Sequence, residues 1–60
     1  MNFSEIVIGE RALAQVSANT REIVEIKGVN DESGLVIVRL SDGKITEIHP
    51  QYIIKTFGIL

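Results

Sequence analysis

The sequence predicts an all-β fold in which five short strands build one small barrel. Two observations carry this prediction. Most of the apolar 45% of the chain is Ile, Val and Leu, whereas only three residues are aromatic: Phe3, Tyr52 and Phe57. An apolar content dominated by such aliphatic residues, above all the β-branched Ile and Val, is typical of strands. The second observation is a hairpin signal, because Asp42-Gly43 separates two apolar runs. Sixty residues make a single small domain, so we treat residues 1–60 as one unit.

The hairpin around Asp42-Gly43 is the most readable element. The run "LVIVRL" at residues 35–40 is almost continuously apolar, which is the pattern of a strand covered at least partly on both faces. Residues 45–49 are the return strand. Pro50 has no backbone N–H to donate to a neighbouring strand, so this strand should end there or lie at an edge of the sheet.

Further strands flank this hairpin on both sides. Residues 21–29 alternate imperfectly, with Val24 and Ile26 on one face, and residues 30–34 follow as a loop of turn-forming residue types. After Pro50, the sequence predicts one tight turn and then a short closing strand within residues 54–60.

The first twenty residues allow two readings. Residues 10–18 carry good helix formers, with Leu13 and Val16 at helical spacing. The same stretch also alternates at strand spacing, which places three residues on one face: Ala12, Ala14 and Val16. We favour a strand over residues 11–16, because the strands of the second half need neighbours to cover their edges. A short helix covering one end of the barrel remains the alternative.

The stretch "VRLSDGKITEIHPQYI" at residues 38–53 resembles the distal hairpin and following one-turn helix of small SH3-like barrels. These include Tudor-like and KOW-like modules and small bacterial and phage proteins. The resemblance implies a five-stranded barrel with a 3-10 turn near residues 50–53. This chain departs from the ligand-binding members, because a groove for Pro-rich peptides or a methyl-lysine cage needs several aromatic side chains.

Composition excludes several classes of function. The chain has no Cys and one His, which argues against disulfides, thiolate metal sites and a zinc site, and no cofactor is predicted. A net charge of −2 with mixed signs argues against a general nucleic-acid or membrane-surface binder. No apolar run approaches the roughly 18 residues that span a bilayer. No signal peptide is visible at the N-terminus, so a cytoplasmic location is expected.

His49 is the one plausible general base, and Glu47 is close enough in sequence to pair with it. A hydrolase would also need a nucleophile, and Ser41 and Asp42 belong to the hairpin turn at the other end of the strand. We therefore expect a half-exposed His that ends a strand, and a protein that is not an enzyme.

The sequence contains more apolar residues than a small barrel needs. Nine residues are enough to fill the interior: Val16, Val24, Ile26, Val36, Val38, Leu40, Ile45, Ile48 and Ile53. Other apolar residues remain for a surface, and six of them form the candidate partner-binding set: Leu35, Ile37, Ile54, Phe57, Ile59 and Leu60. Such a surface usually marks an interface. The leading hypothesis is therefore a non-enzymatic adaptor or inhibitor that self-associates or docks on a partner protein.

The alternative hypothesis is a nucleic-acid-binding barrel. It would use Lys27, Arg39 and Lys44 on one outer face to contact phosphates, as the resemblance to KOW-like barrels implies. Acidic residues on the same strands favour a mixed, solvated face instead. The sequence identifies neither the partner nor the number of subunits.

Overall fold

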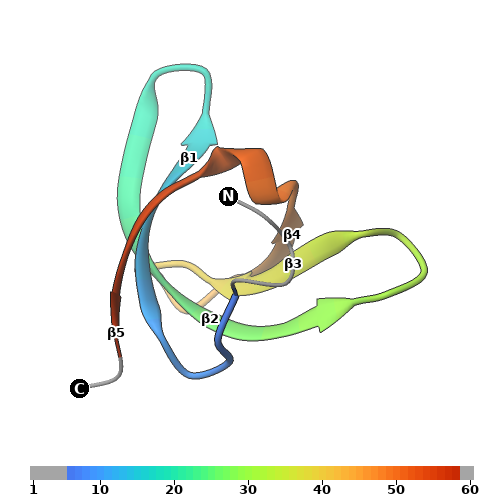
Figure 1. The fold of residues 1–60 in the computed structure, drawn as a ribbon. Coiled ribbons are helices and arrows are strands. Elements are labelled where there is room, and N and C mark those ends of the chain that lie inside the picture. Colours follow the sequence, from blue (N-terminus) through green and yellow to red (C-terminus); the bar gives the residue numbers. More distant parts are fainter. Residues whose placement is uncertain (1–5, 59–60) are drawn as a thin grey trace.

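A computed structural model describes residues 6–58 and confirms the all-β prediction (Figure 1). Its elements, in chain order, are β1 (Arg11–Ser17), β2 (Thr20–Asn30), β3 (Leu35–Arg39), β4 (Ile45–Ile48), the 3-10 turn η2 (Pro50–Tyr52) and β5 (Ile53–Gly58). All neighbouring strands are antiparallel, in the order β4-β3-β2-β1-β5. The described part of the chain contains no helix besides η2, and residues 11–17 form the strand that we favoured.

The sheet is strongly curled, so that its strands surround a common interior (Figure 1). β4 and β5 are the two edges of the sheet, and η2 carries the chain from one edge to the other. η2 forms where the sequence predicts it, because Pro50 ends β4 and supplies the first residue of the turn. The Nδ1 atom of His49 accepts a hydrogen bond from the Gln51 N–H at 3.2 Å and so caps this turn.

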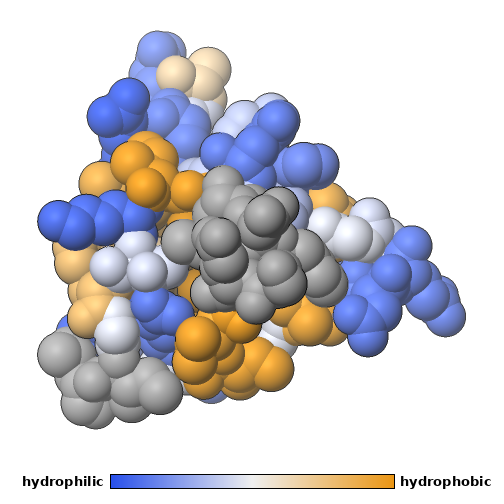
Figure 2. Space-filling view, in the orientation of Figure 1, coloured by the Kyte–Doolittle hydropathy of each residue, from blue (hydrophilic) through white to orange (hydrophobic). Residues whose placement is uncertain are grey.

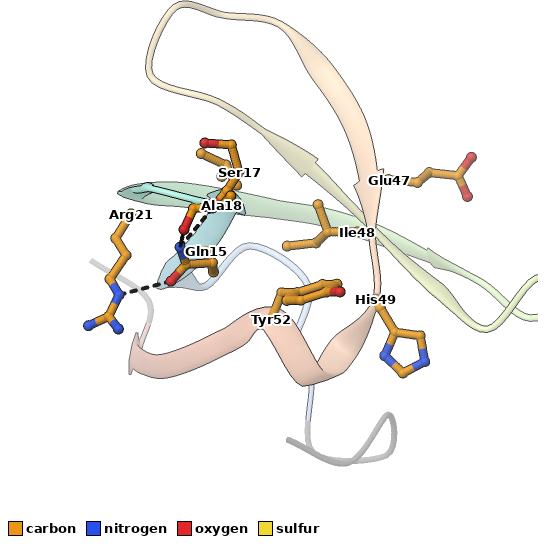
Figure 3. Close-up of a pocket in the computed structure, with 9 residues that line it drawn as sticks. Gln15, Ser17, Ala18, Arg21, Glu47, Ile48, His49 and Tyr52 are labelled. Atoms are coloured by element: carbon orange, nitrogen blue, oxygen red, sulfur yellow. Dashed lines mark hydrogen bonds between the residues drawn. The ribbon is translucent and has the colours of Figure 1, made fainter.

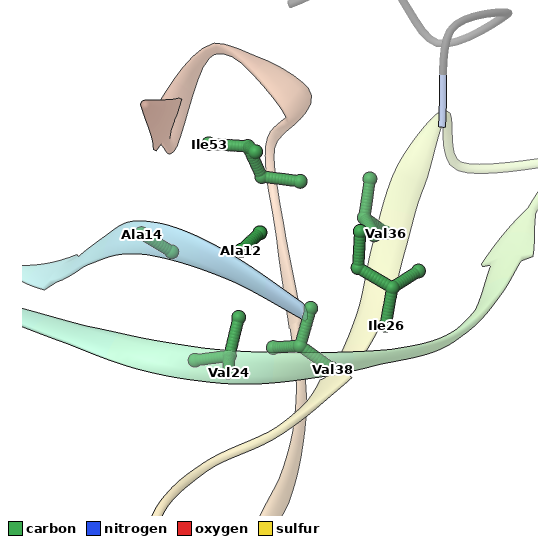
Figure 4. Close-up of a cluster of buried hydrophobic side chains, with 7 residues drawn as sticks. All are labelled: Ala12, Ala14, Val24, Ile26, Val36, Val38 and Ile53. Carbon is green, nitrogen blue, oxygen red and sulfur yellow. The ribbon is translucent and has the colours of Figure 1, made fainter. Parts of the chain in front are cut away.

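The core consists of the inward-facing residues of four strands (Figure 4). Its buried members are Ala12, Ala14, Val24, Ile26, Val36, Val38 and Ile53, and Ile6, Val16, Leu40 and Ile48 pack against them. Eight of the nine predicted interior residues lie in this set. Ile45 was predicted wrongly and is 53% exposed. Ile45 and Ile48 are three residues apart, so in a strand of period two they face opposite sides. Ile45 pairs with the exposed Arg39, whereas Ile48 pairs with the buried Val36.

The β3–β4 hairpin has a longer loop than the two-residue turn that Asp42-Gly43 suggests. Leu40 donates to the carbonyl of Lys44 at 2.8 Å and accepts from Gly43 at 2.9 Å. Gly43 has a φ of 90°, while Asp42 does not have a positive φ. One positive φ after a tight turn is typical of a three-residue loop, whereas a two-residue type I′ turn needs two. The Asp42 carboxylate accepts from the Lys44 N–H at 2.9 Å and so stabilises the loop.

Candidate functional site

A groove lies where the β1–β2 hairpin faces the end of β4 and η2 (Figure 3). Its volume is about 780 Å³, and it is open to solvent. One wall consists of Gln15, Val16, Ser17, Ala18 and Arg21, and the other of Glu47, Ile48, His49 and Tyr52. A space of this size is within the range of ligand sites. The half-buried Val16 and Ile48 give it an apolar base, and polar groups form its rim.

Gln15 organises the hairpin side of the groove. Its side-chain amide donates to the carbonyls of Ser17 at 2.7 Å and Ala18 at 3.2 Å. Its side-chain oxygen accepts from Arg21 Nε at 2.9 Å, which leaves the other guanidinium nitrogens at the rim (Figure 3). Tyr52 is the one aromatic residue among the described residues that line the groove, so the groove offers little for Pro-rich ligands.

The two candidate acid–base residues have separate structural roles. Glu47 points away from Tyr52 (Figure 3), and its carboxylate accepts from Asn30 Nδ2 at 3.3 Å and Ser33 Oγ at 3.5 Å. His49 caps η2, and its ring lies edge-on to Tyr52 with the centroids 6.4 Å apart. Ser41 Oγ donates to Glu22 at 3.1 Å in the β3–β4 hairpin. The Glu47–His49 pair that the sequence allows is not among these contacts, because each of the two side chains bonds to other partners.

Residues 6–58 contain no group of three or more His, Asp or Glu side chains that could hold a metal ion. No helix in that same range has the length and apolarity needed to cross a membrane.

The predicted partner-binding residues fall into separate places. Leu35 and Ile37 are half-buried on β3, and the Ile37 side chain lies over Gly28 of the neighbouring strand. Ile54 and Phe57 are each 46% exposed on β5. Strands β2 and β1 separate β3 from β5, so these four residues do not form one patch. The other two, Ile59 and Leu60, lie outside the described residues.

The structure adds two residues to the β5 part of this set. Leu13 of β1 pairs with Ile23 of β2 on one side and with Lys55 of β5 on the other. Leu13 lies on the face opposite Ala12 and Ala14, and Ile23 is 45% exposed. We call Leu13, Ile23, Ile54 and Phe57 the β5 surface. Alternation along residues 11–16 is the signal that could have identified Leu13.

Hydrophobic and hydrophilic residues are mixed on the face shown in Figure 2. Hydrophilic residues gather at the tips of the β1–β2 and β2–β3 hairpins, which project from the body of the molecule. Apolar surface lies closer to the centre of the molecule, where the strands converge. On this face, exposed apolar groups therefore lie mainly on the body rather than on the hairpin tips.

The predicted basic residues do not form a continuous positive face. Glu25 pairs with Arg11 on one side and Arg39 on the other, and its carboxylate is 3.5 Å from Lys27 Nζ. Lys44 is separate from this group, in the β3–β4 loop. The alternation of charge matches the mixed, solvated face that we expected as the ordinary explanation of these residues.

Comparison of this chain with protein-family models, curated proteins and solved structures finds no match.

Proposed function

We propose that this chain is a non-enzymatic protein-interaction module, a small adaptor or inhibitor with an SH3-like arrangement of strands. The arrangement is supported by the meander β1–β4, the 3-10 turn after β4 and the return of β5 to pair with β1. The function is supported by surface chemistry, because the fold alone assigns none.

One observation carries the proposal. In the described residues, as many large hydrophobic side chains remain about half exposed as there are residues in the buried core. Two of the core residues are Ala, so the interior is small. Isolated exposed apolar residues are ordinary, but a cluster on neighbouring strands usually marks an interface. The β5 surface is such a cluster, and it accounts for three of the exposed large side chains: Ile23, Ile54 and Phe57.

The test compares Ile54→Lys with Asn19→Lys. Both substitutions add one positive charge at an exposed position, the first on the β5 surface and the second in the β1–β2 turn. Self-association is measured by light scattering, and binding of another protein by capture from the host cell. We expect wild type and Asn19→Lys to bind equally and Ile54→Lys to lose binding. Equal binding by all three proteins, or no binding by wild type in either assay, would contradict the proposal.

The nucleic-acid alternative has less support from the geometry, because Glu25 lies among Arg11, Lys27 and Arg39. It predicts an affinity that falls steeply with salt and is lost on Arg39→Glu. Absence of binding to single- and double-stranded nucleic acid at low salt would rule it out.

A further inference from the structure

β5 has a free edge. It pairs with β1 on one side, and no strand within residues 6–58 pairs with its other side. An exposed edge presents backbone N–H and C=O groups to any other strand. Natural edges are protected by Pro, by charges or by bulges. Strand β5 has no Pro and one charged residue, Lys55, and its pairing with β1 contains two irregularities.

The apolar residues of β5 coincide with irregularities in its pairing. The β1–β5 ladder shifts register twice, and the two β5 residues without a partner on β1 are Ile54 and Phe57. These are also the two β5 residues that expose large hydrophobic side chains. Nearly half of each side chain therefore stays uncovered by the described chain.

We propose that β5 of a second copy of this chain pairs antiparallel with this edge, about a two-fold axis that passes through Thr56. The proposal rests on the proposed function and specifies the partner. The two sheets then join into one sheet that crosses the axis.

The register follows from symmetry. Residue pairs in an antiparallel ladder alternate between two kinds, so a two-fold axis must pass through a residue that faces its own copy. An axis through Lys55 would place two like charges opposite each other, which is destabilising. An axis through Thr56 pairs Thr56 with itself, and Thr–Thr pairs are favourable. This register also uses residues 54–58 of both copies, whereas axes nearer either end of β5 use fewer.

The same register gives the exposed residues complementary partners. Phe57 faces Lys55 of the second copy, and Ile54 faces Gly58 of the second copy. Within one chain, Lys55 Nζ already lies 5.7 Å from the centre of the Phe57 ring. Across the axis, each ammonium group therefore lies near two aromatic rings, and cation–π attraction acts both within and between the copies.

The small size of the core favours a second copy as the occupant of this edge. A domain of about 60 residues with a small core is often stabilised further by a disulfide, a metal or oligomerisation. The sequence has no Cys, and the described residues contain no cluster that could hold a metal. Pairing through the β5 edge is the device of this kind that the described residues offer.

Disulfide trapping tests the axis, since the wild-type chain has no Cys. Thr56→Cys places two thiols directly opposite each other, at a separation that a disulfide can bridge. In Lys55→Cys, each thiol faces residue 57 of the second copy instead of its own counterpart. We expect Thr56→Cys to form covalent dimers much faster than Lys55→Cys, and a mixture of Lys55→Cys with Phe57→Cys to form mixed dimers. Equal rates for the two single variants, or no dimers of Thr56→Cys, would overturn the proposal.

A charge pair tests the register independently of cysteine chemistry. Phe57→Glu places a carboxylate opposite Lys55 of the second copy, whereas Phe57→Lys places a second ammonium there. We expect Phe57→Glu to remain a dimer and Phe57→Lys to dissociate about tenfold more readily, because each change acts at two symmetric positions. Equal loss in both variants would exclude this register. A monomeric wild type that still binds another protein, with that binding lost in Ile54→Lys, would refute the second copy and leave the interaction module standing.

Discussion

Ile26 is fully buried, and it pairs with the equally buried Val38 at the centre of the sheet. Ile26→Ala should lower the free energy of unfolding by about 2 to 5 kcal/mol, because it removes buried methyl groups and leaves a cavity. Ile45→Ala is the matched control at an exposed position and should cost less than about 1 kcal/mol. Urea denaturation measures the free energy of unfolding of both variants. A similar cost for the two variants would mean that Ile45 is buried and that the interior has been assigned wrongly.

Two glycines should respond in opposite directions to Ala. Gly43 has a φ of 90°, which side-chain-bearing residues rarely adopt, so Gly43→Ala should destabilise by about 1 kcal/mol or more. Gly28 has no positive φ, and an added Cβ would lie 3.9 Å from Ile37 Cδ1, an ordinary contact. Gly28→Ala should be neutral or stabilise by up to about 1 kcal/mol, since it restricts the unfolded chain. Thermal unfolding monitored by circular dichroism compares the stability of the two variants with that of wild type. A stable Gly43→Ala variant would show that the β3–β4 loop does not need this conformation.

Residue positions were predictable where alternation settles the facing side. Val24, Ile26, Val36 and Val38 are inside as expected, since each lies two residues from another apolar residue of its strand. The exposure of Ile45 follows from the same rule once the β4 register is known. The two core alanines, Ala12 and Ala14, were not included in the predicted interior, because a small side chain gives a weak burial signal in sequence alone.

At the scale of elements, one side chain joins β2 to the β3–β4 loop. A Glu22 oxygen accepts from the Ser41 N–H at 3.0 Å and from Ser41 Oγ at 3.1 Å. Glu22→Ala should therefore destabilise the fold by about 1 kcal/mol. Glu32→Ala is the control, because Glu32 is exposed in the β2–β3 turn, and it should have little effect. Equal unfolding midpoints in urea for both variants would mean that this contact does not hold the loop.

The strands and turns were largely predictable from the sequence, because the alternation of side chains along a strand and the residue preferences of turns are local properties. The strands of the second half and the turn after Pro50 lie close to their predicted ranges. Residues 11–16 remained ambiguous because their composition suits a helix as well as a strand. Pairing of β1 with both β2 and β5 settles the choice, and β5 lies far away in sequence.

The division of the candidate site was not predictable for a related reason. Leu35 and Ile37 were grouped with Ile54 and Phe57 on composition, but the strand order places two strands between them. Local sequence does not encode strand order. The long-range pairing of β1 with β5 brings Leu13 next to Lys55, and Ile23 lies one strand further on, so that both extend the apolar surface.

At the scale of the whole molecule, the small core and the exposed apolar side chains have one explanation in common. The curled sheet buries seven residues in its core, and the β5 surface remains outside next to a free strand edge. Pairing through β5 would cover that edge and bring Ile54 and Phe57 of the two copies close to the interface. The groove between the β1–β2 hairpin and η2 lies elsewhere, lined by no residue of β5, and would stay open to a further partner.

The most direct measurement is the solution mass of the wild-type chain, determined by light scattering on a sizing column over a wide concentration range. The account predicts twice the mass of one chain at high concentration, with dissociation on dilution. Phe57→Lys should shift that dissociation to higher concentration, while Phe57→Glu should leave it near the wild-type range. A wild-type mass of one chain at every concentration would contradict the claim that two copies associate through β5.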